Sequence, residues 1–146
     1  MAINTKKVLL GGLAAAVVLN VVDYIVYDHI LATRMTAAAD AFKPGLGAQM
    51  MSGNAVIGYV LTDLVIGMLL VWTYAAIRPR FGPGMRTATY AALLFWVLGF
   101  LSAMGSMQTG MMSAKLWGAT MAVLLGNLLI AAWVGARIYT EESATT

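Results

Sequence analysis

The sequence predicts an all-α membrane protein, a four-helix bundle that crosses a bilayer in up-down-up-down order. Three observations predict this fold class. Of 146 residues, 61% are hydrophobic and 10% are charged. The mean hydropathy is +0.82, and four apolar stretches of about 20 residues are separated by short polar loops. A helix of that length is roughly 30 Å long, which matches the hydrocarbon core of a bilayer, whereas strands of a barrel would be shorter and would alternate in polarity.

The four predicted spans leave little chain outside the membrane, so we treat residues 1–146 as one membrane domain. The spans are residues 8–31, 54–77, 87–107 and 116–138. The first span follows Lys6 and Lys7 as a signal peptide would, but its apolar run is too long and Asp23 interrupts it. We expect a retained helix. The sequence has no cysteine, which excludes disulfides, thiolate metal sites and cysteine catalysis.

Two loops have compositions that predict their conformation. Residues 78–84 contain two prolines and two glycines, which predicts the end of the second helix and a tight reversal into an antiparallel third helix. In the longer first loop, residues 33–42 are expected to form a short surface helix. The Lys43-Pro44-Gly45-Leu46-Gly47 segment should break that helix.

The distribution of basic residues predicts the orientation in the membrane. Six lie on one side: Lys6, Lys7, Arg78, Arg80, Arg86 and Arg137. Three lie on the other: Arg34, Lys43 and Lys115. Because short loops rich in Lys and Arg stay in the cytoplasm, both termini and the second loop are expected there. The same flanking positions account for the net charge of +3, so no nucleic-acid partner is expected.

Two segments together resemble a known group of proteins. They are the Arg78-Pro79-Arg80-Phe81-Gly82-Pro83-Gly84 loop and the Val18-Leu19-Asn20-Val21-Val22-Asp23-Tyr24 stretch of the first span. With most of the remaining chain, they resemble a group of uncharacterised bacterial four-helix integral membrane proteins. That resemblance implies the topology and a location in the bacterial cytoplasmic (inner) membrane. It implies no activity.

Polar residues inside three of the spans are the strongest functional signal. Counted from the outer ends of their spans, Asp23 and Asp63 lie roughly 12–14 Å deep, and Asn20 and Asn127 lie roughly 16 Å deep. Helical spacing places two sets of side chains on one face each, and we expect both faces to turn inward. The sets are Asn20, Asp23 and Tyr27 on the first helix, and Tyr59, Asp63 and Gly67 on the second.

These acids support two interpretations. No Lys or Arg lies at their depth, and an ionised carboxylate in hydrocarbon is costly unless it is protonated, paired, hydrogen-bonded or reached by water. Asp23 and Asp63 could be neutral acids that join helices through Asn20 and Asn127. Alternatively they could share a proton or bind a cation, as in a proton- or cation-coupled transporter. Asn20, Asn127 and Tyr59 would then orient the two acids.

A second signal is the placement of methionine. Seven of the eleven methionines fall in or beside the outer loops. Thioethers suit Cu(I), so Met104, Met107 and Met111 with His29 are candidate ligands for periplasmic copper handling. Methionine also fills gaps at adaptable contact surfaces, and that is the competing interpretation. The sequence requires no cofactor, although His29 could serve as an axial ligand in a pigment complex.

Small residues at four-residue spacing predict close helix packing, within one chain or between chains. Gly118, Ala122 and Gly126 form such a face on the fourth helix, and Gly12 with Ala16 begins another on the first. We therefore expect a homo-oligomer or a partnership with other membrane subunits. No catalytic constellation is present, so the chain is not expected to be an enzyme. A structural or accessory subunit is the first functional expectation, an ion-coupled transporter the second and copper handling the third.

Overall fold

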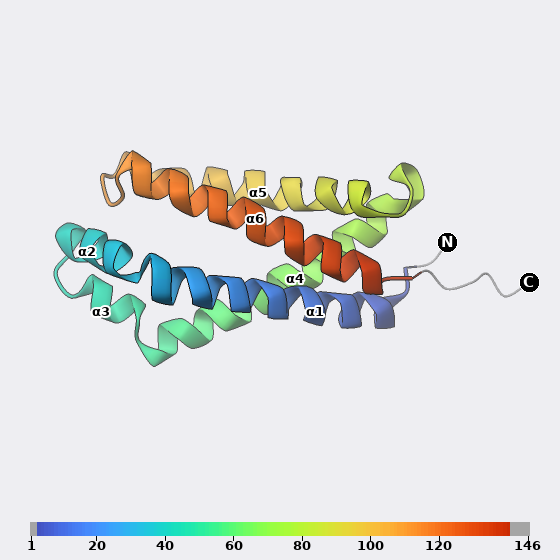
Figure 1. The fold of residues 1–146 in the computed structure, drawn as a ribbon, viewed down its shortest axis with the longest axis horizontal. Coiled ribbons are helices and arrows are strands. Elements are labelled where there is room, and N and C mark those ends of the chain that lie inside the picture. Colours follow the sequence, from blue (N-terminus) through green and yellow to red (C-terminus); the bar gives the residue numbers. More distant parts are fainter. Residues whose placement is uncertain (1–2, 141–146) are drawn as a thin grey trace, which may run out of the picture.

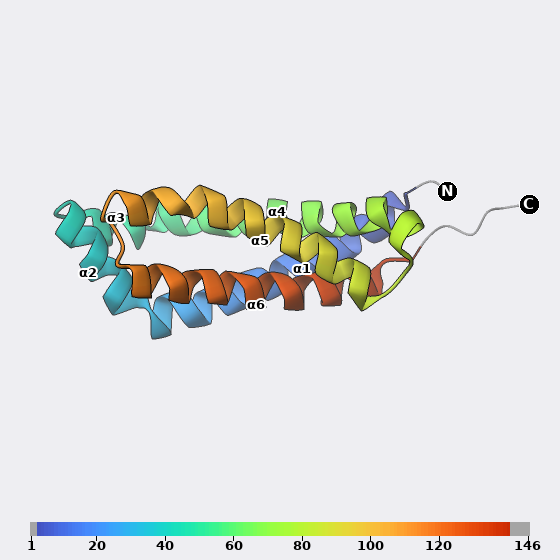
Figure 2. The same cartoon turned by 90° about the horizontal axis from the view of Figure 1, so that it is seen from above.

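The computed structural model describes residues 3–140, and all regular elements within this range are helices. The long helices are α1 (Thr5–Asp23), continued by η1 (Tyr24–Ile30), then α4 (Gly53–Phe81), α5 (Met85–Gln108) and α6 (Ala114–Ile138). Two short helices, α2 (Ala32–Phe42) and α3 (Leu46–Met50), lie between η1 and α4. The start of α1, the α4–α5 turn and the end of α6 lie at one end of the bundle, here called the terminal end (Figures 1 and 2). The short helices and the α5–α6 turn lie at the other, the loop end.

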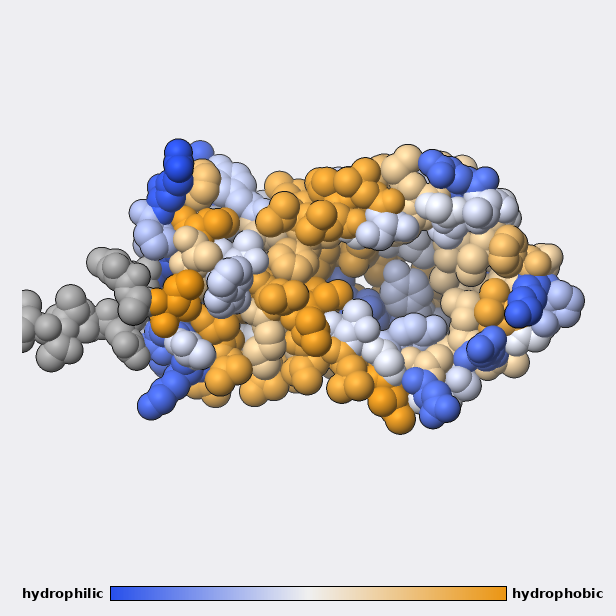
Figure 3. All heavy atoms as spheres, turned by 180° about the vertical axis from the view of Figure 1, so that it is seen from behind, coloured by the Kyte–Doolittle hydropathy of each residue, from blue (hydrophilic) through white to orange (hydrophobic). Residues whose placement is uncertain are grey.

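The all-α prediction and the four predicted spans are confirmed at the level of length and composition. Thr5–Ile30, Gly53–Phe81, Met85–Gln108 and Ala114–Ile138 are each long and apolar enough to cross a membrane. The face drawn in Figure 3 is mostly hydrophobic along its middle and carries hydrophilic side chains at both ends. That distribution matches a bundle whose side faces lipid and whose ends face water.

Both loop predictions are tested by the helix ends. The short surface helix is confirmed as α2, whose C-cap Lys43 is extended, as expected for a residue before proline. The predicted end of the second helix within residues 78–84 is confirmed, since α4 ends at Phe81, beyond the predicted span of residues 54–77. Pro79 lies in the last turn, where it removes one backbone hydrogen bond, the one that residue 79 would donate to the Ala75 carbonyl. The reversal follows at Gly82 and Gly84, whose φ angles are +83° and +112°.

A π-helical segment that the sequence did not predict continues α1. Residues Tyr24–Ile30 are wound as a π-helix directly after Asp23. At its end, the N–H of Leu31 donates to the Val26 carbonyl, five residues earlier, at 2.7 Å. A π-turn holds more residues than an α-turn, so side chains beyond Asp23 point in directions that α-helical counting does not give.

Small side chains make the terminal half of the bundle tight. Ala15, Ala88, Ala91 and Ala131 are fully buried there. At the crossing of α1 and α4, a methyl group added to Gly67 would lie 2.6 Å from the backbone nitrogen of Ala16. Backbones therefore approach closely in this half, as small-residue helix faces allow.

Three tryptophans fasten α5 to α6 along their length. The indole N–H of Trp96 donates to the Met121 carbonyl at 2.9 Å, and that of Trp117 to the Ala103 carbonyl at 3.0 Å. The third, Trp133, donates to the Thr89 hydroxyl at 3.0 Å. By contrast, among the described residues no side chain of α4 between Gly53 and Leu70 makes a hydrogen bond to another helix. The loop half of α4 is thus held mainly by its packing against α1.

Candidate functional site: a polar layer shared by three helices

Asn127 is the centre of the polar layer. It lies on α6, is only 2% exposed, and points toward α1. Its Nδ2 donates to the Leu19 carbonyl at 3.2 Å and to Oδ1 of Asp23 at 2.7 Å. Both partners are acceptors, which fixes the orientation of the amide. The Oδ1 atom of Asn127 is consequently buried with no donor among the described residues.

Asp63 brings α4 into the same layer. It is 8% exposed, and it is near enough to Asp23 for the two charges to interact. The phenol of Tyr27, on η1, lies within electrostatic range of both acids. No group of residues 3–140 donates a hydrogen bond to Asp63. The structure thus brings together Asp23, Tyr27, Asp63 and Asn127 from α1, η1, α4 and α6.

The layer lies in the more open half of the molecule. Figure 3 shows that the face formed by α4 and α5 is hollowed toward the loop end, and that hydrophilic side chains lie inside the hollow. The two helices are joined by their tight turn at the terminal end and diverge from it, as Figure 1 shows. The loop half of α4 therefore borders an open space on the side of the bundle, whereas the alanine-rich terminal half is closed by packing.

Two expected members of the site lie elsewhere. Asn20 donates to the carbonyl of Ala16 in its own helix at 3.0 Å, and it lines an otherwise apolar groove between α1 and α4. Tyr59 is 53% exposed and points away from the bundle. Both were expected to face inward with Asp23 and Asp63. The difference arises because α1 and α4 cross at an angle, so only part of each polar face reaches the interior.

The two small-residue faces have different positions. Gly12 and Ala16 pack against α4, where a methyl group on Gly67 would lie 2.7 Å from the Gly12 carbonyl oxygen. Gly118, Ala122 and Gly126 are exposed, and an added methyl group on either glycine would meet no atom within 4 Å. The α6 face therefore points outward and is not used for packing within the chain.

The candidate copper ligands, His29 and three methionines, contact residues that are close to them in the sequence. His29 is exposed and meets Tyr24 edge to face, with ring centroids 4.8 Å apart. Met104, Met107 and Met111 are half-buried near the α5–α6 turn, where the neighbouring Met112 sulfur accepts a hydrogen bond from Ser106 at 3.9 Å. Within residues 3–140, no group of three or more His, Asp or Glu side chains could hold a metal ion. Copper binding by the methionine sulfurs stays a prediction.

Sequence reasoning missed the groups that position the layer. The Leu19 carbonyl, which holds the Asn127 amide, is a backbone group and carries no sequence signal. The π-segment, which places Tyr27, has no recognisable signature in its residues either. The three indole hydrogen bonds had a partial signal, because buried tryptophan N–H groups nearly always find an acceptor.

Comparison with protein-family models, with curated proteins and with solved structures finds no match for this chain. The class of protein therefore follows from its own fold. It is an all-helical bundle whose four long helices can each cross a membrane, which indicates a membrane protein.

Proposed function

We propose that this chain is a four-span protein of the bacterial cytoplasmic membrane that binds and transports a proton or a small cation through Asp23 and Asp63. The helices run up, down, up and down, and both termini face the cytoplasm. The excess of Lys and Arg at the terminal end supports this orientation. The polar layer then lies in the half of the bundle nearer the periplasm.

The observation that carries the proposal is the chemistry of the layer. Asp23, Asp63 and the buried Asn127 oxygen offer acceptors, and among the described residues the only donor that bonds to any of them is the Asn127 Nδ2 group. Two carboxylates that interact in a medium of low dielectric constant cannot both remain charged cheaply. A proton held between them, or a cation bound to their oxygens, removes that cost.

The hollow beside α4 supports transport over a purely structural role. Neutral acids that only join helices are satisfied by their hydrogen bonds, and Asp23 meets that description through Asn127. Asp63 does not, because no described residue donates to it, and it lies on the helix that borders the hollow. Ionisable groups in this situation commonly lie on ion pathways.

Flux through reconstituted vesicles tests the proposal. The purified chain is placed in liposomes that contain a pH-sensitive dye or a dye selective for sodium or potassium, and a pH gradient is applied in sodium, potassium or choline buffer. We expect proton or cation flux from the natural chain, and a loss of about tenfold or more in Asp63→Asn and Asp23→Asn. Asp28→Asn is the matched control, since Asp28 lies on η1 without a hydrogen bond to any described residue, and its flux should be unchanged.

The result that would overturn the proposal is equally definite. If vesicles with the natural chain leak no faster than empty vesicles in all three buffers, the chain transports none of these ions. If flux is present but survives both Asp→Asn changes, the polar layer is not its pathway.

A structural or accessory subunit is the second candidate function, favoured by the outward α6 face. Gly118, Ala122 and Gly126 leave a flat strip on which another helix can approach closely. The occupant we propose is α6 of a second copy, because like strips pack against each other about a two-fold axis. The two functions are compatible, since the polar layer lies inside the bundle and the strip outside it.

A further inference from the structure

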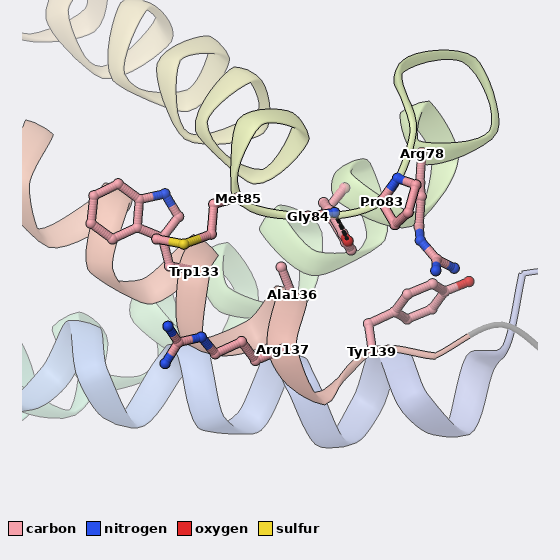
Figure 4. A pocket seen from close by; sticks show the side chains of 9 residues that line it. Arg78, Pro83, Gly84, Met85, Trp133, Ala136, Arg137 and Tyr139 are labelled. Atoms are coloured by element: carbon pink, nitrogen blue, oxygen red, sulfur yellow. Dashed lines mark hydrogen bonds between the residues drawn. The ribbon is translucent and has the colours of Figure 1, made fainter.

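A cavity at the terminal end has no part in the polar layer. Its volume is about 190 Å³, and it lies between the last turn of α4, the α4–α5 turn and the last turns of α6. Tyr74, Arg78, Pro83, Gly84, Met85, Trp133, Ala136, Arg137 and Tyr139 line it. Figure 4 shows Arg78 and Arg137 on opposite sides, with Gly84 and Ala136 between them and Met85 beside Trp133.

The cavity is built to attract an anion. Arg78 is anchored, because its guanidinium carbon lies 5.7 Å from the centre of the Tyr139 ring. Arg137 is exposed and extends along the side of α6 that faces Trp133 (Figure 4). Met85 begins α5, and its N-cap Gly84 has no side chain that could cap the first turn. The Gly84 N–H itself donates to the Tyr74 hydroxyl at 3.1 Å. The N–H groups of an uncapped first turn favour a negatively charged oxygen.

The position and the apolar lining narrow the choice of anion. An arginine in the last turn of a helix is explained by the helix dipole or by orientation in the membrane. Neither the helix dipole nor the orientation in the membrane explains a cavity between two arginines that is also lined by Trp133, Met85 and Ala136. A group that is anionic at its head and apolar beside it matches this lining, and the ends of the spans lie at the level of lipid head groups.

We propose that this cavity binds a phosphate group, and that the source of the phosphate is an anionic phospholipid of the inner leaflet. Arg137 and Arg78 hold the phosphate oxygens, because guanidinium groups bind phosphate with charge-assisted hydrogen bonds. The glycerol and the first acyl carbons lie against Trp133 and Met85. The inference does not depend on ion transport through Asp23 and Asp63, but the choice of the inner leaflet rests on the proposed orientation of the terminal end.

Native mass spectrometry of the delipidated, full-length chain tests this inference. Phosphatidylglycerol, phosphatidylethanolamine with the same acyl chains, and inorganic phosphate are titrated separately. We expect phosphatidylglycerol to bind several-fold more tightly than phosphatidylethanolamine, and Arg137→Gln to weaken it about tenfold. Arg80→Gln is the matched control. Arg80 is an exposed arginine in the last turn of α4, the turn that contains Arg78, and it does not line the cavity. Its effect should stay within about twofold.

Arg78 is tested with a variant that keeps its charge. Arg78→Lys preserves the positive charge but loses the planar fork, so phosphatidylglycerol binding should still weaken by several-fold. The melting temperature of each variant, measured in detergent, separates lost binding from lost folding. Arg137→Gln, on an exposed side chain, should melt with the natural chain.

Three results would overturn the inference. Equal losses in Arg80→Gln and Arg137→Gln would show general surface attraction. Arginine-dependent binding of inorganic phosphate without binding of phosphatidylglycerol would assign the cavity to a soluble phosphate. Glu141 and Glu142 follow the cavity in sequence, so the Glu141→Gln/Glu142→Gln variant is titrated as well. Lipid binding by that variant alone would show that the chain's own carboxylates occupy the cavity.

Discussion

The side-chain amide of Asn127 on α6 donates a 2.7 Å hydrogen bond to the carboxylate of Asp23 on α1. This bond joins residues 104 positions apart in the chain. It turns the Asp23 carboxylate toward the interior, where its charge meets that of Asp63. A single amide thereby joins α6 to α1 at the site we propose for ion binding.

Loss of this amide should destabilise the bundle. Asn127→Ala removes the bonds to Asp23 and to the Leu19 carbonyl, and we expect a loss of about 1 kcal/mol, the usual range for hydrogen bonds between membrane helices. Unfolding in mixed micelles with increasing dodecyl sulfate measures this change. Asn20→Ala is the control, because Asn20 bonds only within its own helix. Equal losses in the two variants would contradict the assigned role of Asn127.

The crossing of α1 and α4 should tolerate no side chain at Gly67. In Gly67→Val, the first added carbon would lie 2.6 Å from the Ala16 backbone nitrogen, and backbone atoms cannot move aside by changing rotamer. We expect a loss of about 1–3 kcal/mol in the same unfolding assay. Gly58→Val on the same helix has open space around it and should cost far less. A stable Gly67→Val variant would mean that the helices cross elsewhere.

The outward α6 strip should control self-association without affecting the fold. Gly118→Leu or Gly126→Leu places a bulky side chain on the strip, so close approach of a second copy is blocked. Cross-linking in membranes should give dimers from the natural chain and few from either variant, while the melting temperature stays unchanged. Gly105→Leu, at another open glycine near the end of α5, should leave the dimers intact. Natural chains that give no dimers would remove the proposed partner.

Chemical labelling should detect a protonated acid in the polar layer. Hydrophobic carbodiimides react with carboxylic acids in their protonated form, so labelling of Asp63 should fall as pH rises. If sodium lowers the labelling at constant pH, the bound ion is a cation; if it does not, the ion is a proton. Peptide mass spectrometry locates the adduct, with Asp28 as the internal control. Labelling of Asp28 and Asp63 to the same extent at every pH would contradict a special environment for Asp63.

Several elements of the fold could be predicted from the sequence. The apolar length of each span and the α2 helix followed from hydropathy, helical length and the Pro-Gly break after Phe42. The shared depth of Asp23, Asp63 and Asn127 followed from counting along the spans. The last residue of α4 could not be predicted, because Pro79 removes one hydrogen bond to the preceding turn but does not force the helix to end at that position.

What the sequence by itself determined is the set of membrane segments, because partition of a helix between lipid and water depends on its length and composition alone. The tertiary structure decided which side of each helix faces inward. That choice depends on where the backbones approach, at Gly67 over Gly12 and Ala16 and at Gly11 beside Gly135 of α6, and on the π-segment after Asp23. These contacts turn Asp63 and Asn127 inward and leave Tyr59 and the strip of Gly118, Ala122 and Gly126 outside. Helical spacing alone does not distinguish the inward positions from the outward ones.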